Sequence, residues 1–204
     1  GHPMPWNTNK TIGAVVAITI ILSIVVLIFV NLPKQTEEPT QEDTNDRKTA
    51  PAIFNISYDV EQKNFTLGEL LQLESYTGRG GYRTQSGFIK GLGNYTGVAI
   101  SALVSMFPSL PNLYSLEVFS EDEARFYNYS TIIGNVSIYN PSNASDPNPI
   151  GIGTMTMVLA YQYEGDWLNE SNDGKLKIVF LDDEGSITES SLWWKKVTSI
   201  RLIT

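Results

Sequence analysis

The segments that decide the fold are Thr154–Tyr161 (TMTMVLAY) and Leu176–Leu181 (LKIVFL). In each short run, apolar, β-branched and aromatic residues dominate and polar residues are few. Runs of this length and composition are typical of strands in a protein core. The two segments therefore predict two core strands.

Working outward, three further segments alternate between apolar and polar residues with a period of two: Phe54–Tyr58, Ser115–Phe119 and Val197–Ile203. This alternation favours strands that bury one face. The turn-rich stretch Asn140–Pro149 (NPSNASDPNP) separates such strands and favours an exposed loop.

Two short helices are expected between the strands. Thr66–Leu71 begins as a capping box, with Thr66 as the N-cap and Glu69 three residues later. The apolar run Ile100–Phe107 is stopped by a proline. The segment 51–204 is thus predicted as an α+β domain, with a mixed, mostly antiparallel β-rich sheet system and short helices.

The chain before this domain has a different character. Ile12–Val30 is an uncharged run that as a helix reaches about 28 Å, close to the thickness of a bilayer core. It predicts a single N-terminal transmembrane helix, preceded by a segment 1–11 in which residues 1–3 resemble a tag remnant. The segment 31–50 is polar and poor in aromatic residues, which favours a disordered stalk.

The domain carries seven N-x-Ser/Thr sequons, and N-glycosylation at such sites requires transfer across a membrane. We therefore expect a single-pass protein of the cell membrane whose C-terminal domain is extracytoplasmic and glycosylated. The candidate acceptors are Asn55, Asn64, Asn94, Asn128, Asn135, Asn143 and Asn169.

Composition excludes several chemistries. The chain has no cysteine and its one histidine is His2, so thiolate metal sites, cysteine nucleophiles and a Ser-His-Asp triad cannot be built. No catalytic residue and no metal ligand is predicted. The net charge of −8 disfavours nucleic acid as a partner.

The glycine-rich stretch Tyr76–Gly97 (YTGRGGYRTQSGFIKGLGNYTG) is the one segment that suggests a nucleotide site. Its G-x-G-x-x-x-G spacing is one residue longer than the dinucleotide fingerprint, and no Walker lysine follows. Tight turns between strands are the expected role of these glycines.

Several segments resemble, in the same order, the molybdopterin-dependent oxidoreductase domain, the central domain of the sulfite oxidase family. The matching segments are Thr66–Leu71 (TLGELL), Tyr95–Leu103 (YTGVAISAL), Leu159–Tyr161 (LAY), Gly165–Leu168 (GDWL), Gly174–Val179 (GKLKIV) and Trp193–Ile200 (WWKKVTSI). The resemblance covers about residues 54–204 and implies that fold.

The chain departs from this family at the metal ligand. Catalytic members carry a cysteine thiolate upstream of the Y/W-T-G-V segment, whereas here Glu74–Gly81 contains none. A hydroxyl is a harder and far less acidic ligand that does not replace a thiolate. The expectation is therefore no cofactor. If a molybdopterin is retained, the candidate residues for holding it are Thr77, Arg79, Arg83 and Lys90.

Other groups have both a functional and a structural interpretation. The acidic clusters at 121–123 and 182–184 suggest Ca²⁺ ligands, but neither matches a calcium loop and solvated turns are favoured. Trp193 and Trp194 are adjacent and so face opposite sides of a strand, one toward the core and one toward an edge or ligand surface. Tyr127, Tyr129 and Tyr139 suggest an aromatic patch, with ordinary packing as the default.

The function predicted from the sequence is a membrane-anchored, extracytoplasmic binding or structural module on a degenerate molybdopterin-domain scaffold. Two alternatives stay open: a membrane-tethered oxidoreductase subunit that retains molybdopterin, and a pilin-like filament subunit assembled through its apolar helix. Expected partners are the membrane through Ile12–Val30, and either another surface protein or further copies of the chain.

Overall fold

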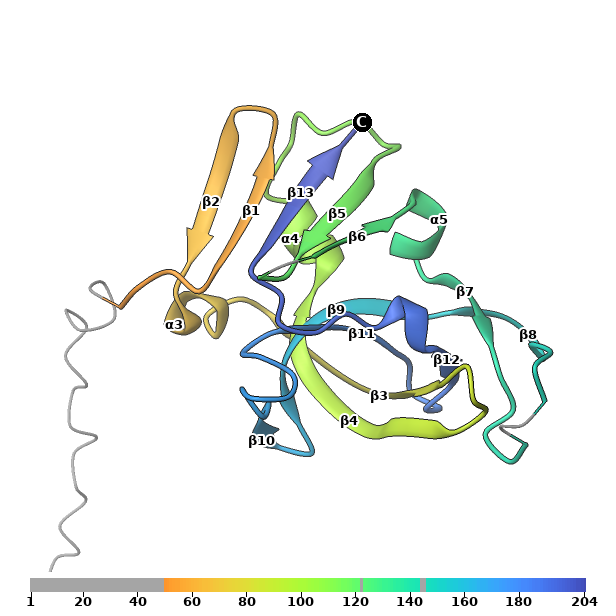
Figure 1. Cartoon of the computed structure of the whole chain (residues 1–204). Helices are drawn as coiled ribbons and strands as arrows, with labels where there is room; N and C mark the ends of the chain where they lie inside the picture. Colours follow the sequence, from red (N-terminus) through yellow and green to blue (C-terminus); the bar gives the residue numbers. More distant parts are fainter. Residues whose placement is uncertain (1–49, 122, 144–145) are drawn as a thin grey trace, which may run out of the picture. The chain divides into compact units, whose positions relative to one another are not determined.

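The computed structural model describes residues 50–121, 123–143 and 146–204 (Figure 1). The chain divides into two units, Gly1–Asp46 and Arg47–Thr204, and the described residues all belong to the second. The predicted transmembrane helix, the tag remnant and nearly all of the stalk lie outside the described residues. Within those residues, no helix is long and apolar enough to cross a bilayer.

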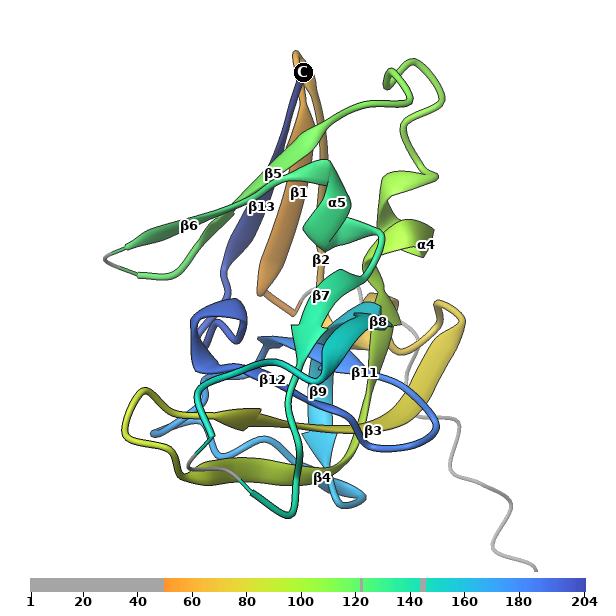
Figure 2. The ribbon, with the colours of Figure 1, turned by 90° about the vertical axis from the view of Figure 1, so that its right-hand side faces the viewer.

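The first sheet has five strands in the order β2-β1-β13-β5-β6. Its only parallel pair is β1 with β13, and the other neighbours are antiparallel. Figure 2 shows that the short helices α4 and α5 lie on the same side of this sheet. Its strands are β1 (Phe54–Tyr58), β2 (Glu61–Phe65), β5 (Ser115–Phe119), β6 (Ala124–Tyr127) and β13 (Ser199–Ile203).

The second sheet follows the order β10-β9-β4-β3-β12, and β11 pairs with β9 beside β10. Reciprocal backbone hydrogen bonds between Arg79 and Asp182, of 2.8 and 3.0 Å, join β3 to the end of β11. The strands β3, β4, β9 and β11 therefore curve around until the last meets the first. They are β3 (Ser75–Arg83), β4 (Ile89–Ala99), β9 (Thr156–Tyr163), β10 (Asp166–Trp167), β11 (Lys177–Leu181) and β12 (Ile187–Glu189).

A separate hairpin pairs β7 (Asn135–Ile138) with β8 (Gly151–Thr154). The turn-rich stretch predicted from the sequence lies between these strands, and residues 141–143 and 147–149 of it are exposed. The helices are α3 (Leu67–Leu70), α4 (Ile100–Val104), α5 (Tyr129–Ile132) and the 3₁₀ turn η1 (Ser190–Leu192). The capping box is confirmed, because Thr66 Oγ1 accepts from the Glu69 amide at 3.2 Å and Glu69 Oε2 accepts from the Thr66 amide at 2.8 Å.

The predicted α+β class is wrong, because the domain is mostly β. The longest helix in the described part of the chain has five residues, and α4 ends at Val104 instead of reaching Phe107. Helices this short add little stability of their own and serve as connections between strands.

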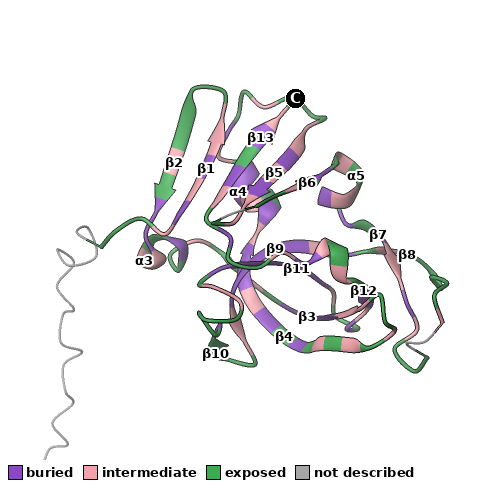
Figure 3. Cartoon of the chain, viewed as in Figure 1, coloured by how far each residue is buried: buried purple, intermediate pink, exposed green. Residues whose placement is uncertain are grey.

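The core forms two clusters on opposite faces of β9 and β11, which are the two core strands predicted from the sequence. Ile178 and Phe180 belong to the main core, which also fills the space beneath the first sheet. Val179 and Leu181 face the other way. Figure 3 shows that β11 is buried throughout and that the middle of β9 is buried. The second group, here called the floor cluster, consists of Tyr95, Val158, Ala160, Leu168, Val179, Leu181 and Trp193.

The glycine-rich stretch forms two long strands, β3 and β4, instead of a series of tight turns. Gly97 shows why glycine is needed within a strand: a Cβ there would overlap the carbonyl oxygen of Leu159 on β9. The pairing register between β4 and β9 shifts at Thr96 and Gly97, so the two backbones approach closely at an irregularity.

Candidate functional site

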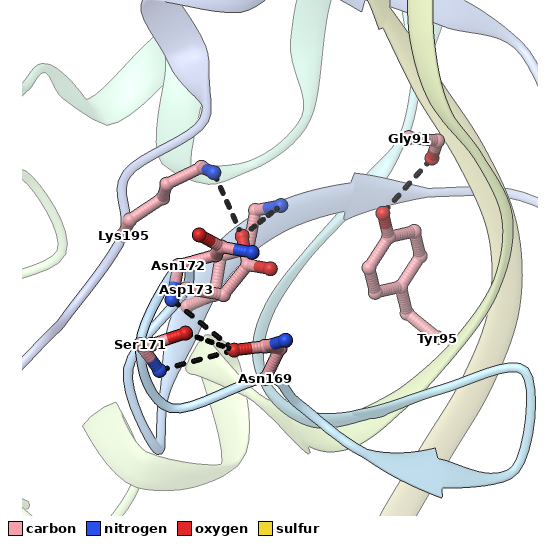
Figure 4. Close-up of polar contacts among 8 residues, drawn as sticks. Gly91, Tyr95, Asn169, Ser171, Asn172, Asp173 and Lys195 are labelled. Atoms are coloured by element: carbon pink, nitrogen blue, oxygen red, sulfur yellow. Dashed lines mark hydrogen bonds and ion pairs between the residues drawn. The ribbon is translucent and has the colours of Figure 1, made fainter.

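The candidate site is a cavity of about 500 Å³ above the floor cluster, here called the site cavity. It lies against the glycine-rich β3–β4 hairpin, and its lining contains aromatic rings and charged groups of both signs. Figure 4 draws Tyr95, Asn169, Asp173 and Lys195 from this lining. It is lined by Tyr82, Gly91, Tyr95, Tyr163, Glu164, Asp166, Trp167, Leu168, Asn169, Asp173, Lys177 and Lys195.

Lys177 is the central charged group of the site. It opens β11 on the face that carries Val179 and Leu181, so its side chain enters the floor cluster, and the residue is 4% exposed. Its ammonium lies 5.8, 5.6 and 5.3 Å from the ring centroids of Tyr82, Tyr95 and Trp193. Three ring faces thus surround one cation at distances typical of cation–π contacts.

Asp173 holds this lysine and a second one in place. Its Oδ1 accepts from Lys177 Nζ and from Lys195 Nζ, both at 3.0 Å (Figure 4). Its backbone carbonyl accepts from the Lys196 amide at 2.7 Å. Asp173 therefore fastens the loop before β11 to the segment that follows Trp194.

The loop that carries Asp173 is shaped by Asn169. The Asn169 side-chain oxygen accepts from the Ser171 amide at 3.1 Å, from the Ser171 hydroxyl at 2.6 Å and from the Asn172 amide at 3.3 Å. This is an Asx turn, in which a short side chain replaces a backbone acceptor. The turn presents Asp173 to the two lysines.

Burial and ion pairing shift the pKa values of Lys177 and Asp173 in opposite directions. Burial lowers the pKa of Lys177 below the ordinary lysine value, and the bond to Asp173 only partly offsets this. Burial raises the pKa of Asp173, but the bonds from Lys195 and Lys177 outweigh it, so the net shift is downward. Asp173 is therefore the carboxylate at neutral pH, and Lys177 depends on it.

The aromatic walls of the cavity are fixed by hydrogen bonds to the backbone. Tyr95 donates its hydroxyl to the Gly91 carbonyl at 2.9 Å, and Tyr163 donates to the Leu92 carbonyl at 3.1 Å. The two rings pack with centroids 4.7 Å apart. Burial is the main cause that raises the pKa of Tyr95 far above that of a free tyrosine, so its hydroxyl stays neutral.

The rim of the cavity is the tight turn between β9 and β10. Glu164 has φ of 52° and Gly165 has φ of 84°, the left-handed pair that a two-residue hairpin favours. Glu164 tolerates this conformation because its amide donates to the Asn94 carbonyl at 2.8 Å and its Oε1 accepts from the Asn94 amide at 2.7 Å. The turn places Trp167 at the rim with 55% of its surface exposed.

A second hollow of about 340 Å³ adjoins the first. Tyr82 and Lys195 line both, so these side chains stand between them. The second hollow adds Trp193, Trp194 and Glu123 to the lining. The two hollows together extend the candidate site along the segment that carries Lys195.

The adjacent tryptophans face opposite sides, as predicted. Trp193 is 6% exposed, belongs to the floor cluster and donates Nε1 to the Thr188 hydroxyl at 2.7 Å. Trp194 packs against the main core, and the guanidinium of Arg125 lies 4.5 Å from its ring centroid.

The four candidate pterin residues do not come together around a cavity. Thr77, Arg79 and Arg83 follow one another along β3, and a span of six strand residues is about 20 Å long. The Thr77 hydroxyl is bonded to Thr96 at 2.9 Å, and the Arg83 guanidinium lies 5.6 Å from the Tyr139 ring centroid. None of the four, Lys90 included, lines either hollow. The residues present therefore do not fit a molybdopterin at this hairpin.

The other candidates have local structural roles. Asp182 Oδ1 accepts from the amides of Gly185 and Ser186 at 2.6 and 3.0 Å, so this acidic cluster forms a turn. Tyr127 donates to the Leu192 carbonyl at 2.9 Å, and the Tyr139 hydroxyl bonds to a Glu189 carboxylate oxygen. Tyr129 packs edge-on against Tyr114, with ring centroids 5.5 Å apart. The three tyrosines thus make separate packing contacts, which is the default expected from the sequence.

Of the seven sequon asparagines, Asn55 is half-buried in β1 and the other six are exposed. Asn169 also lines the site cavity, so a glycan attached there would start at its rim. Asn128 caps α5, since its Oδ1 accepts from the Thr131 amide at 2.9 Å.

Sequence reasoning placed Lys177 in a strand but did not identify it as a site residue. One signal was available: Lys177 is the only charged residue in an otherwise apolar run, and Asp173 precedes it by four residues. A charge within a buried strand requires a partner, so this pattern marks an internal ion pair.

The fold and this site define a mostly β domain with a curved sheet that cradles an aromatic–lysine cavity. No family model matches the chain, and no curated protein does either. Among solved structures, the chain is similar to the sulfane dehydrogenase SoxCD from Paracoccus pantotrophus, with 14% identity and a TM-score of 0.52. The similarity covers 77% of this chain and 39% of that chain, so the chain corresponds to well under half of that protein's length.

An identity this low shows the fold alone. It gives a weak link, at the level of the fold, to the molybdopterin oxidoreductases that the sequence resembles. The active site and the reaction do not follow from it.

Proposed function

We propose that the domain is a non-catalytic binding module, built on a scaffold related in fold to molybdopterin-dependent oxidoreductases, and that its ligand occupies the site cavity. The observation that carries this proposal is the cavity itself: about 500 Å³, walled by tyrosine and tryptophan rings, with fixed ammonium and carboxylate groups at its base. A concave aromatic surface with a few converging polar groups is the usual form of a ligand site.

The state of the polar groups favours binding over catalysis. Lys177 and Lys195 are paired with Asp173, and the hydroxyls of Tyr95 and Tyr163 donate to backbone carbonyls. Groups held in this way are ready to orient a ligand, and rigid positioning reduces the entropy lost on binding. Burial lowers the pKa of Lys177 overall, but we assign this amine to binding because both lysines are held by Asp173.

The seven sequons and the apolar run Ile12–Val30 support an extracytoplasmic domain attached to a membrane. In this arrangement the cavity would meet ligands outside the cytoplasm. Assembly into filaments through the apolar run stays a prediction from the sequence.

The proposal is tested by mapping fragment binding on the isotope-labelled full chain with nuclear magnetic resonance. A library of small aromatic and polar fragments is expected to shift the amide signals of Leu168 and Lys177 while leaving those of β1 and β2 unchanged. Fragments that bind only elsewhere, or none that bind, would contradict a ligand site at this cavity.

The oxidoreductase alternative needs its own measurement. Protein purified from its own host is analysed for molybdenum and for the fluorescence of released pterin. The proposal expects neither in stoichiometric amount, whereas one molybdenum per chain would overturn it in favour of the tethered oxidoreductase.

A further inference from the structure

We propose that the ligand is a neutral oligosaccharide that lies across both hollows, over Trp167 and past Lys195 toward Trp194. This inference rests on the proposed function, because it names the ligand class of the same site. It follows from the exposed tryptophan, the balance of charge in the cavity and the continuity of the two hollows.

Trp167 supplies a flat apolar surface at the rim. It is 55% exposed on the short strand β10, yet its ring is backed by Tyr161, with centroids 6.0 Å apart. The turn behind it is held by the bonds between Glu164 and Asn94. The C–H bonds on one face of a sugar ring carry partial positive charge, which matches the negative face of an aromatic ring.

The charges around the site cavity nearly cancel. Three acidic residues, Glu164, Asp166 and Asp173, and two basic residues, Lys177 and Lys195, line it. An anionic ligand would meet three carboxylates, and a cationic ligand would meet two ammonium groups. A hydroxyl both donates and accepts, so a polyhydroxylated ligand without net charge can bond to both kinds of group.

The continuity of the hollows favours a chain over a single sugar. Tyr82 and Lys195 line both, and the second hollow adds Trp194 and the carboxylate of Glu123. Aromatic and charged side chains therefore line each of the two adjoining hollows. Lys195 is 45% exposed at its side chain and is held by Asp173, so its remaining ammonium hydrogens can donate to hydroxyls on either side.

The test uses the full chain and isothermal titration with neutral hexasaccharides of glucose, N-acetylglucosamine and mannose, together with each monosaccharide. At least one hexasaccharide is expected to bind about tenfold or more tightly than its monosaccharide. Trp167→Ala is expected to weaken that binding by about tenfold or more, as for a central aromatic contact, and Trp167→Phe to retain most of it.

Phe88→Ala is the matched control, because Phe88 is another exposed aromatic residue, at 66% against 55% for Trp167, and lines neither hollow. It should leave saccharide affinity unchanged. Binding of hexagalacturonate or inorganic phosphate in preference to every neutral sugar would overturn the inference, and so would the absence of any hexasaccharide binding. If fragments still map to Leu168 and Lys177 in that case, the binding site stands and only the ligand class is wrong.

Discussion

Replacing Asp173 with alanine tests the ion pair between Asp173 and Lys177. The substitution removes the carboxylate that accepts from Lys177 and Lys195 at 3.0 Å each. Lys195 is 45% exposed at its side chain and can turn to solvent, so its lost pair contributes little. Lys177 is 4% exposed and has no such escape.

An unpaired buried charge costs about 3–5 kcal/mol, so Asp173→Ala should lower the free energy of unfolding by that amount. For a domain of this size the midpoint of thermal unfolding falls by about 10 °C. Lys177→Met removes the buried charge and keeps an apolar stem of similar length. It leaves Asp173 paired with Lys195, and we expect a change within about 1 kcal/mol or a gain in stability.

The double variant Asp173→Ala, Lys177→Met is the decisive comparison. Because the double variant lacks the unpaired Lys177 ammonium, it should recover most of the free energy of unfolding that Asp173→Ala loses. Denaturant unfolding of the full chain, followed by tryptophan fluorescence at neutral pH, measures all three variants. A loss below about 1 kcal/mol for Asp173→Ala, or no recovery in the double variant, would refute the account of Lys177 as a charge that depends on Asp173.

Three further predictions concern pH, packing and modification. The pKa of Asp173 is lower in the folded protein than its value of 3.8 in the unfolded chain, so the ionised carboxylate stabilises the fold above pH 3.8, and this stabilisation is lost as the pH falls through the folded-state pKa. The difference in thermal midpoint between wild type and Asp173→Asn should therefore shrink below pH 3.8. A difference that stays constant with pH would contradict this. Gly97→Ala should lower the free energy of unfolding by about 3 kcal/mol or more, or prevent folding, because its Cβ overlaps a backbone carbonyl of β9. Gly151→Ala is the control: nothing lies within 4 Å of its Cβ, so its thermal unfolding midpoint should be almost unchanged. In protein from its own host, Ser171→Ala should lose the mass of one glycan, whereas Ser171→Thr keeps the sequon and that glycan. The same total glycan mass on both variants would show that this sequon is bare.

Strands that bury only one face could be predicted from the sequence. Phe54–Tyr58, Ser115–Phe119 and the end of Val197–Ile203 alternate because the first sheet buries one face, and the structure has β1, β5 and β13 there. Local rules also predicted the capping box at Thr66, because capping depends only on residues three positions apart.

The glycine-rich hairpin was not readable in the same way. Glycine has low strand propensity, so a stretch with many glycines suggests turns. In the structure these residues are required by neighbours distant in sequence: Gly97 lies against β9, and a Cβ at Gly80 would overlap the Phe180 carbonyl of β11. Such close approaches are set by tertiary packing, which no local pattern contains.

Only part of the site could be predicted from the sequence: the spacing of Asp173 and Lys177 indicates an ion pair, but no local pattern indicates that Lys195 joins it. Lys177 and Lys195 are separated in sequence by a strand and two turns, and they come together through Asp173 and through the backbone bridge between Ile178 and Trp194. The pterin candidates were instead chosen from a single stretch, and residues along one strand spread out over its length.

The alternation of β11 separates what holds the fold from what shapes the site. Ile178 and Phe180 fill the main core, whereas Val179 and Leu181 belong to the floor cluster and Lys177 lines the site cavity. A substitution at Lys177 changes a group offered to a ligand and leaves the contacts beneath the first sheet in place. Because apolar packing on one face is sufficient to fix the register of a strand, the polar groups on the other face are free to differ. This gives a physical reason why a fold shared at 14% identity does not require a shared reaction.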